Sequence, residues 1–329
     1  MKGFLGLALL AIASLPAVAS YDLMLLPGNA PGAGTLRYDP ISETSFGDAG
    51  PKVEPRHVTG HLGKGYAIAT SGARAYQFNY STGERITSFN VGAHKTIDVT
   101  GNGNHLLVGD TALVKSLDLV GGSLVTYQLD KITRVHSIVS YSDQDFYVIG
   151  TDGFNSVLIQ RYQVGKVTNV DATATSFSLV SGFLMGQADY LVNERTLAFT
   201  YRTTLGTAMR LGRIVLSPTG LFAGFGSLPV SEGSSTFDAS TVPTVLNGHD
   251  GFFLAGWDGA TSGAKLRISE FDGFPDVNGF GAIHSTTLSR TTGPEFSAAN
   301  LIAPEPGTWL ALGVGLTVLM RSRRPVKGR

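Results

Sequence analysis

The chain has 329 residues, of which 43% are hydrophobic, only 15% are charged and 42 are glycine. This composition favours a folded all-β chain that is rich in turns. The absence of cysteine excludes disulfides, cysteine-ligated metals and a thiol nucleophile. Between residues 20 and 300 the chain carries 19 basic and 24 acidic residues, and this acidic balance predicts no nucleic-acid partner.

The first 19 residues have the pattern of a signal peptide. Lys2 precedes an apolar run, and Ala17 and Ala19 form a small-x-small cleavage signal. We therefore predict a signal helix over residues 1–19, which signal peptidase removes so that the mature chain begins at Ser20. A buried N-terminal helix is the alternative interpretation.

From Tyr21 onward, a strand–turn–strand unit recurs six times at spacings of about 40 to 57 residues. The first strand of each unit is short and apolar, as in YAIAT and HLLVG, which is typical of strands covered on both faces. The second strand alternates apolar and polar residues, and Gly- and Asp-rich turns join the two. The units cover residues 21–39, 65–79, 104–118, 144–163, 194–215 and 250–272.

Three or four strands in each such repeat predict a β-propeller. The stretch IDVTGNGNHLLVG (97–109) resembles the repeats of YVTN- and lactonase-type propellers. The six repeats predict one propeller over residues 20–300 with six blades, or seven if the wide spacing after Tyr162 hides a further one. A two-sheet sandwich and two separate all-β domains are the alternatives. Since the mature chain begins with the second strand of a blade, we expect GAIHSTTLSR (281–290) to supply the missing inner strand and close the ring.

Four histidines occupy similar positions at the starts of predicted inner strands. Such strands line the axial channel, where imidazoles can bind a divalent metal or act in acid–base catalysis. Arg56 and Arg134 lie close to two of them and would instead suit an anionic ligand. The alternative is that each imidazole is bonded to nearby backbone. The four are His57, His94, His136 and His284.

Oxygen-bearing side chains alternate in the stretch DVTGNGN (98–104), so that Asp98, Asn102 and Asn104 are candidate calcium ligands. A plain polar hairpin is the alternative. The sequence contains no Gly-x-Ser-x-Gly, phosphate-binding loop or His-Glu-x-x-His motif. We therefore nominate no catalytic residue, and we expect no cofactor unless the histidines hold a divalent metal.

The last 27 residues combine three features in order: Pro304-Glu305-Pro306, an apolar run ending at Met320, and a cluster of Arg321, Arg323 and Arg324. The apolar run is short for a bilayer-spanning helix, and the arginines would remain on the cytoplasmic side. The order of features resembles the PEP-CTERM sorting signal. The resemblance implies that residues 303–329 include a short transmembrane helix, at least transiently in the membrane, and that an exosortase removes this tail. A plain C-terminal membrane anchor is the alternative.

The sequence thus predicts an exported protein of the cell envelope, cell surface or extracellular matrix of a Gram-negative-type bacterium. Its propeller would act as a non-enzymatic interaction module, with a polysaccharide or a surface protein as partner. The alternative is a metal-assisted propeller enzyme of lyase, lactonase or glycosidase type that uses the channel histidines. A purely structural matrix component is a third interpretation.

Overall fold

The computed structural model describes most of the chain between Asp22 and Ile302. The predicted signal helix with its cleavage residues, and the C-terminal sorting signal with its hydrophobic helix, lie outside the described residues. Among the residues that are described, no helix is long and apolar enough to cross a membrane. The described range is interrupted at residues 27–34, 40–43, 50–54, 62–63, 70–72, 80–81, 83, 93, 95, 153–155, 167–174, 179–183, 192–194, 203–207, 232–236, 239–241, 249–250, 259–264, 272–279, 282–283 and 289–298.

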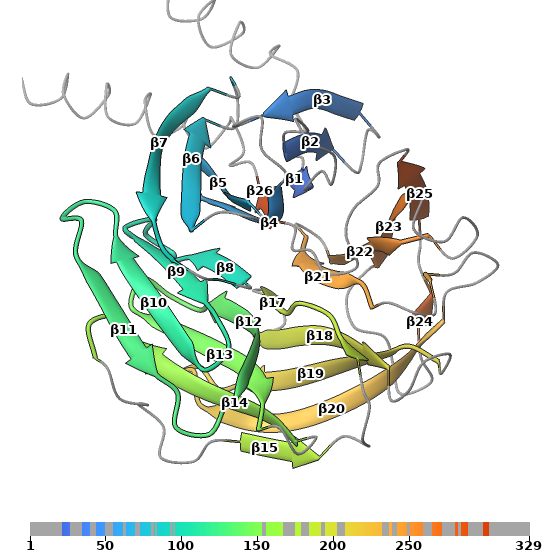
Figure 1. The fold of residues 1–329 in the computed structure, drawn as a ribbon. Helices are drawn as coiled ribbons and strands as arrows, with labels where there is room; N and C mark the ends of the chain where they lie inside the picture. Colours follow the sequence, from blue (N-terminus) through green and yellow to red (C-terminus); the bar gives the residue numbers. More distant parts are fainter. Residues whose placement is uncertain are drawn as a thin grey trace, which may run out of the picture.

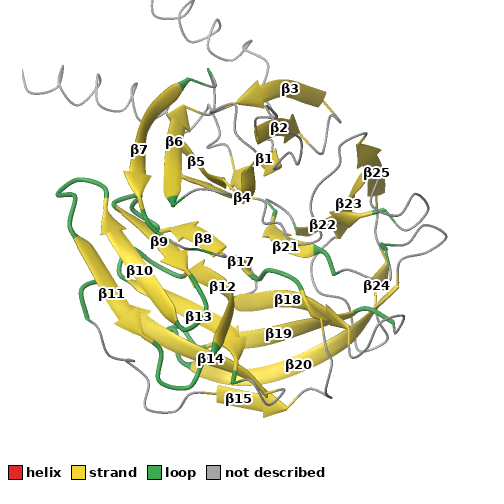
Figure 2. Ribbon diagram, in the orientation of Figure 1, coloured by secondary structure: helices red, strands yellow, loops and turns green. Residues whose placement is uncertain are grey.

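The described elements are strands, and their sheets surround a central axis as the blades of a β-propeller (Figures 1 and 2). Numbered along the chain and written from the axis outward, the first sheet contains β26 (Ala299–Ile302), β1 (Asp22–Leu26), β2 (Thr35–Asp39) and β3 (Thr44–Ala49). The second contains β4 (Pro55–His61), β5 (Lys64–Ala69), β6 (Arg74–Asn79) and β7 (Arg85–Asn90). The third contains β8 (Thr96–Val99), β9 (His105–Gly109), β10 (Leu113–Asp118) and β11 (Leu124–Gln128).

The remaining sheets follow the same outward order. The fourth contains β12 (Arg134–Ser140), β13 (Asp145–Thr151), β14 (Ser156–Gln163) and β15 (Thr175–Ser178). The fifth contains β16 (Leu184–Met185), β17 (Asp189–Leu191), β18 (Thr196–Arg202), β19 (Arg210–Leu216), β20 (Phe222–Ser231) and β24 (Phe280–Gly281). The sixth contains β21 (Thr244–Asn247), β22 (Phe252–Trp257), β23 (Leu266–Phe271) and β25 (His284–Leu288).

The prediction of six blades, or seven, is wrong, because only five regular four-stranded blades are present among the described residues. Five of the described sheets are regular four-stranded blades, whereas the fifth sheet along the chain has six strands. Its inner position is divided between β16 and β17, which both pair with β18, and β24 adds in parallel to the outer strand β20. Each sequence repeat marks only a hairpin, and a hairpin does not reveal how many further strands its sheet contains.

The prediction that residues 281–290 close the ring is also wrong. Residues 284–288 form β25, which pairs with β23 as the outermost strand of the sixth sheet. The ring is instead closed by β26, which pairs antiparallel with β1, for example Asp22 with Ile302. The first sheet therefore joins both ends of the described chain, and no inner strand is missing from it.

The burial of the second strands follows from their position between neighbouring sheets. Every described side chain of β18 is buried, and β9, β13 and β22 are buried along most of their length. Aromatic rings fill the space between the sheets: Phe146 stacks on Tyr162 with centroids 5.8 Å apart, and Tyr127 meets both rings edge-on. The predicted double-sided burial of these apolar strands is therefore confirmed.

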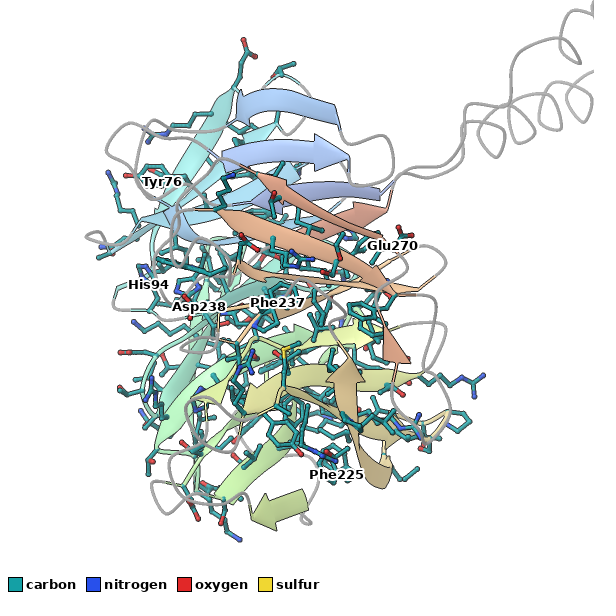
Figure 3. The ribbon with its side chains drawn as sticks, turned by 90° about the vertical axis from the view of Figure 1, so that its right-hand side faces the viewer. Tyr76, His94, Phe225, Phe237, Asp238 and Glu270 are labelled. Carbon is teal, nitrogen blue, oxygen red and sulfur yellow. The ribbon has the colours of Figure 1, made fainter. Side chains whose placement is uncertain are left out.

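The propeller has two faces, which differ in the kind of loop they carry. The turn from the inner to the second strand of each sheet lies on one face, here called the hairpin face. The inner strands begin at the opposite face, here called the connection face, because the chain crosses there from sheet to sheet. Figure 3 shows His94 and Asp238 toward one of these faces and Glu270 toward the other.

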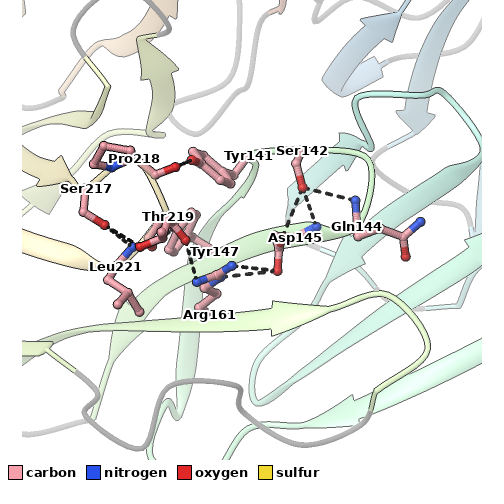
Figure 4. Close-up of polar contacts among 11 residues, drawn as sticks. Tyr141, Ser142, Gln144, Asp145, Tyr147, Arg161, Ser217, Pro218, Thr219 and Leu221 are labelled. Atoms are coloured by element: carbon pink, nitrogen blue, oxygen red, sulfur yellow. Dashed lines mark hydrogen bonds and ion pairs between the residues drawn. The ribbon is translucent and has the colours of Figure 1, made fainter.

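On the hairpin face, the fourth sheet clamps the β19–β20 turn of the fifth (Figure 4). Tyr147 donates a hydrogen bond to the Gly220 carbonyl, and Arg161 donates to the Thr219 carbonyl at 3.1 Å. The Arg161 guanidinium is itself held by Asp145, with Nη2 3.1 Å from Oδ1. Gly220 has φ +77°, and a Cβ there would lie 2.9 Å from the Tyr141 ring and from the Tyr147 hydroxyl.

Gly220→Ala therefore tests the clamp. Gly122→Ala is its matched control, because Gly122 has φ +74° but would have no atom within 4 Å of a new Cβ. Both variants lose about 1 kcal/mol through the left-handed backbone. Gly220→Ala should lose roughly 1–3 kcal/mol more through overpacking. Urea unfolding measures both, and equal losses would show that the clamp adds nothing to stability.

Candidate functional site at the propeller axis

The inner strands β26, β4, β8, β12, β17 and β21 surround the axis, and each contacts the next (Figure 1). Several polar side chains of these short strands are buried, among them Thr59, Thr96 and Ser137. Buried polar groups are costly unless they are hydrogen-bonded. The pattern of bonds in this region therefore shows how the axis is built.

Asp98 on β8 links three sheets. Its Oδ1 accepts hydrogen bonds from the Val99 N–H at 2.8 Å and from the Thr59 hydroxyl of β4 at 3.1 Å. Its Oδ2 accepts from the Ser140 N–H at the end of β12, at 2.6 Å. One carboxylate thus bonds to the second, third and fourth sheets.

Asp189 on β17 repeats this arrangement. Oδ1 accepts from the Tyr190 N–H, and Oδ2 accepts from the Asn247 N–H of β21, both at 2.7 Å. In each case one oxygen binds the following residue, and the other binds backbone of the next sheet. A third link joins the fourth and fifth sheets, because the Ala188 N–H donates to the Ser137 hydroxyl at 2.8 Å.

The surroundings of both carboxylates disfavour their charge. Burial raises the pKa of Asp98 from 3.8 to about 6, although the N–H groups of Ser140 and Val99 oppose the rise. Burial also raises the pKa of Asp189 to about 7, and the negative charge of Asp98 adds to the effect. Two acidic groups that titrate near neutrality therefore lie on the inner strands.

Closer to the connection face, three polar side chains from three sheets meet. Gln187 Nε2 of the fifth sheet donates to His57 Nδ1 of the second and to Thr96 Oγ1 of the third, both at 3.3 Å. His57 and Thr96 are 8% and 1% exposed, so both side chains are buried. Because His57 Nδ1 accepts, the neutral ring carries its proton on Nε2. His57, Thr96 and Gln187 are here called the axial mouth.

The structure distributes the other predicted histidines differently. His94 lies just before β8, and its Nδ1 donates to the Gly92 carbonyl at 2.8 Å, as expected for an imidazole bonded to nearby backbone. His136 lies at a β-bulge in β12, between Val135 and Ser137, and Arg56 occupies a similar bulge in β4. Arg134 begins β12.

His284 does not take the inner-strand position expected for it. It lies on β25, the outermost strand of the sixth sheet, where it pairs with Glu270 of β23. Within the described part of the chain, no three His, Asp or Glu residues gather closely enough to hold a metal ion. The divalent metal at the channel histidines stays a prediction.

The predicted calcium ligands make hydrogen bonds to different parts of the structure. Asp98 bonds to the neighbouring inner strands, as described above. Asn102 Oδ1 accepts from the Thr100 hydroxyl at 2.9 Å and from the Asn104 N–H at 3.0 Å, which stabilises the β8–β9 turn. Calcium binding to Asp98, Asn102 and Asn104 stays a prediction.

Sequence reasoning missed Asp189, Gln187 and Thr96. An alignment of the inner strands could have revealed Asp189. Asp98 pairs with Leu107, the third residue of β9, and Asp189 pairs with Ala198, the third residue of β18, so the two carboxylates occupy equivalent positions. Gln187 lies 130 residues from His57 in the chain, and no local pattern signals that contact.

The buried carboxylates predict that stability falls as the pH rises. Both folded pKa values lie above the ordinary value of 3.8, so the stabilising contribution is complete below about pH 4 and is lost as the pH rises through about 6 and 7. Each carboxylate contributes about 1.4 kcal/mol for every pH unit between its folded and unfolded pKa values. Asp189→Asn should flatten the curve between pH 4 and pH 8.

Urea unfolding at a series of pH values measures this dependence. Glu84→Gln is the control, because Glu84 is exposed and lies in the β6–β7 turn. The control should follow the parent chain at every pH. An Asp189→Asn variant with the parent's pH dependence would contradict the assignment.

Comparison with known proteins supports the fold and identifies no family. No protein-family model matches the chain, and no curated protein sequence matches it. Among solved structures, a chain of a nidogen/laminin complex is similar over 86% of this chain and 98% of its own, with 11% identity and a TM-score of 0.60. A protein of unknown function from Bacteroides caccae covers 86% and 99%, with 11% identity and a TM-score of 0.55.

The hydrazine synthase of Kuenenia stuttgartiensis matches over 73% of this chain and 71% of its own, with 13% identity and a TM-score of 0.52. At such low identity these likenesses concern architecture, and the architecture is that of a β-propeller.

Proposed function

We propose that the chain is an exported, non-enzymatic interaction module of a bacterial cell envelope, which binds a polysaccharide at the axial mouth. The convergence of Gln187, His57 and Thr96 from three sheets carries the proposal. His57 and Thr96 are on strands, and their hydrogen bonds hold Gln187 in position before a ligand arrives, which lowers the entropic cost of binding. A sugar offers hydroxyl groups that can both donate to and accept from such side chains.

The location of the axial mouth supports the same proposal. It lies near the starts of inner strands, where the chain passes from sheet to sheet, and loops on a rigid scaffold commonly carry binding sites. The similar chain from a nidogen/laminin complex belongs to a protein–protein assembly. That likeness supports an interaction role by analogy of fold alone. A surface protein is the second kind of partner that this analogy favours.

Gln187→Leu tests the binding proposal, and Gln144→Leu is its matched control. The control makes the same change in an exposed side chain of the β12–β13 turn, on the opposite face. With extracellular polysaccharide from the bacterium that makes the protein, Gln187→Leu should weaken binding roughly tenfold or more, since the sugar hydroxyl groups lose an amide partner. Gln144→Leu should bind like the parent chain.

Equal binding by both variants would place the ligand elsewhere, and thermal unfolding checks that each variant is folded. Measuring the metal content of the same samples distinguishes the interaction module from the metal-assisted enzyme. A stoichiometric divalent metal that disappears in His94→Ala would favour a metal-assisted lyase, lactonase or glycosidase over an interaction module.

We further propose that both ends are processed during export, by signal peptidase before Ser20 and by an exosortase near Pro304-Glu305-Pro306. The ordered residues of the two terminal signals support this. The intact mass of the protein recovered from its own cells tests it. The expected species begins near Ser20 and ends near Pro306, whereas a species retaining Arg329 would contradict tail removal and indicate a plain membrane anchor.

A further inference from the structure

A group of aromatic and basic side chains lies on the hairpin face, between the fourth and fifth sheets. Tyr141 follows β12, Tyr190 is on β17, and Arg195 immediately precedes β18. Inner strands end and second strands begin at the hairpin face, so all three residues belong to it. This group, here called the hairpin-face site, is on the opposite side of the propeller from the axial mouth.

The two tyrosines form the aromatic part of the hairpin-face site. Their rings meet edge to face, with centroids 5.1 Å apart and planes at 74°. Both rings pack against the apolar cluster between the two sheets, and both are partly exposed. The Tyr141 hydroxyl donates a hydrogen bond to the Pro218 carbonyl of the β19–β20 turn at 3.4 Å (Figure 4). The aromatic surface is therefore held in place and remains partly open to solvent.

Arg195 has a backbone conformation that its residue type does not favour. Its φ is +49°, and no other described non-glycine residue has a positive φ. Its carbonyl accepts from the Leu216 N–H at 2.9 Å, which fixes the β17–β18 turn beside the end of β19. Glycine or asparagine fits the left-handed region with less strain. An arginine in this conformation is better explained by its side chain than by its backbone.

The Arg195 guanidinium and the Tyr190 hydroxyl are both available as donors. Among the described residues, neither group has a hydrogen-bond or ion-pair partner, and the Arg195 side chain is exposed. Burial raises the pKa of Tyr190, the Tyr141 phenol adds to the rise, and the positive charge of Arg195 opposes it. The guanidinium therefore lies within electrostatic range of Tyr190, and the Tyr190 hydroxyl keeps its proton at neutral pH.

Three described carboxylates near this face are directed elsewhere. Asp189 accepts hydrogen bonds from two backbone N–H groups, and Asp145 forms an ion pair with Arg161. Asp143 lies over the third sheet, because its Oδ1 is 3.1 Å from the position that a Cβ of Gly101 would occupy. A negatively charged ligand that approaches the Arg195 guanidinium therefore displaces none of these carboxylates from it.

We propose that the hairpin-face site binds an acidic sugar, with the sugar carboxylate against Arg195 and the sugar ring against Tyr190 and Tyr141. A guanidinium presents a planar fork of donors that matches the two oxygens of a carboxylate. The Tyr190 hydroxyl donates to the same carboxylate or to a neighbouring sugar oxygen. The C–H groups of a sugar ring form an apolar face, which suits partly exposed aromatic rings.

An acidic sugar is favoured over a phosphate or an acidic peptide because one unit carries both a carboxylate and an apolar ring face. A phosphate would use the two donors but would leave the aromatic rings without a contact. An aspartate or glutamate side chain offers only a short, flexible stem to those rings. The hairpin-face site does not depend on binding at the axial mouth, since the two lie on opposite faces and share no residue.

Titration calorimetry with the full chain tests the proposal. Trigalacturonate is the acidic probe, and maltotriose is the neutral sugar of the same length. The parent chain should bind trigalacturonate roughly tenfold or more tightly than maltotriose, because only the former offers carboxylates to Arg195. Arg195→Gln should weaken trigalacturonate binding roughly tenfold, and Tyr190→Phe about threefold, through the loss of a charged and a neutral donor. Thermal unfolding checks that each variant is folded.

Arg85→Gln is the matched control. Arg85 is also exposed on the hairpin face, but its guanidinium lies 5.1 Å from the Tyr76 ring centroid and donates to the Ser88 hydroxyl. Arg85→Gln should bind trigalacturonate like the parent chain. Gln187→Leu should do so too, because it alters only the axial mouth, and this separates a failure of one site from a failure of the other.

Four outcomes would overturn the proposal. The first is a parent chain that binds neither sugar, and the second is unchanged trigalacturonate binding by Arg195→Gln. The third is an equal loss of binding in Arg85→Gln, which would indicate a general attraction between charges. The fourth is binding of triglutamate as tight as that of trigalacturonate, which would indicate an acidic peptide as the ligand.

Discussion

A buried carboxylate that binds the backbone of the next sheet is the interaction on which this propeller depends. Apolar side chains pack between neighbouring sheets, and the contacts near the axis add directional hydrogen bonds to that packing. Asp98 and Asp189 do so with their two oxygens divided between their own strand and the next one.

The same interaction limits what the axis can do. The oxygens of Asp98 that the sequence suggested for calcium are occupied by N–H and hydroxyl donors from three sheets. A binding site for other molecules is more consistent with a place where side chains bond to one another than with a place where a carboxylate bonds to backbone. Gln187 makes such a junction, because its side-chain amide donates to the side chains of His57 and Thr96.

The local features of the fold could be read from the sequence, whereas the long-range ones could not. Apolar runs such as HLLVG and FYVIG predict covered strands because few polar residues interrupt them, and Gly- and Asp-rich turns locate the hairpins. The predicted strand order was wrong where the sequence pattern of a strand is short or ambiguous. ANLI, which forms β26, has only four residues, and the better strand pattern around His284 belongs to the edge of another sheet. The axial residues were largely missed, because Gln187 and Asp189 acquire their roles from His57 and Asn247, which lie 130 and 58 residues away along the chain.

The closure of the ring by β26 also sets the direction in which the chain leaves the propeller. β26 is an inner strand, and inner strands end at the hairpin face; β1, paired antiparallel with it, begins there. A chain held to a surface through the residues that follow Ile302 is therefore attached by its hairpin face. The connection face, with the axial mouth, then points outward from that surface. In such an orientation the axial mouth would face molecules in the surroundings rather than the surface that holds the chain.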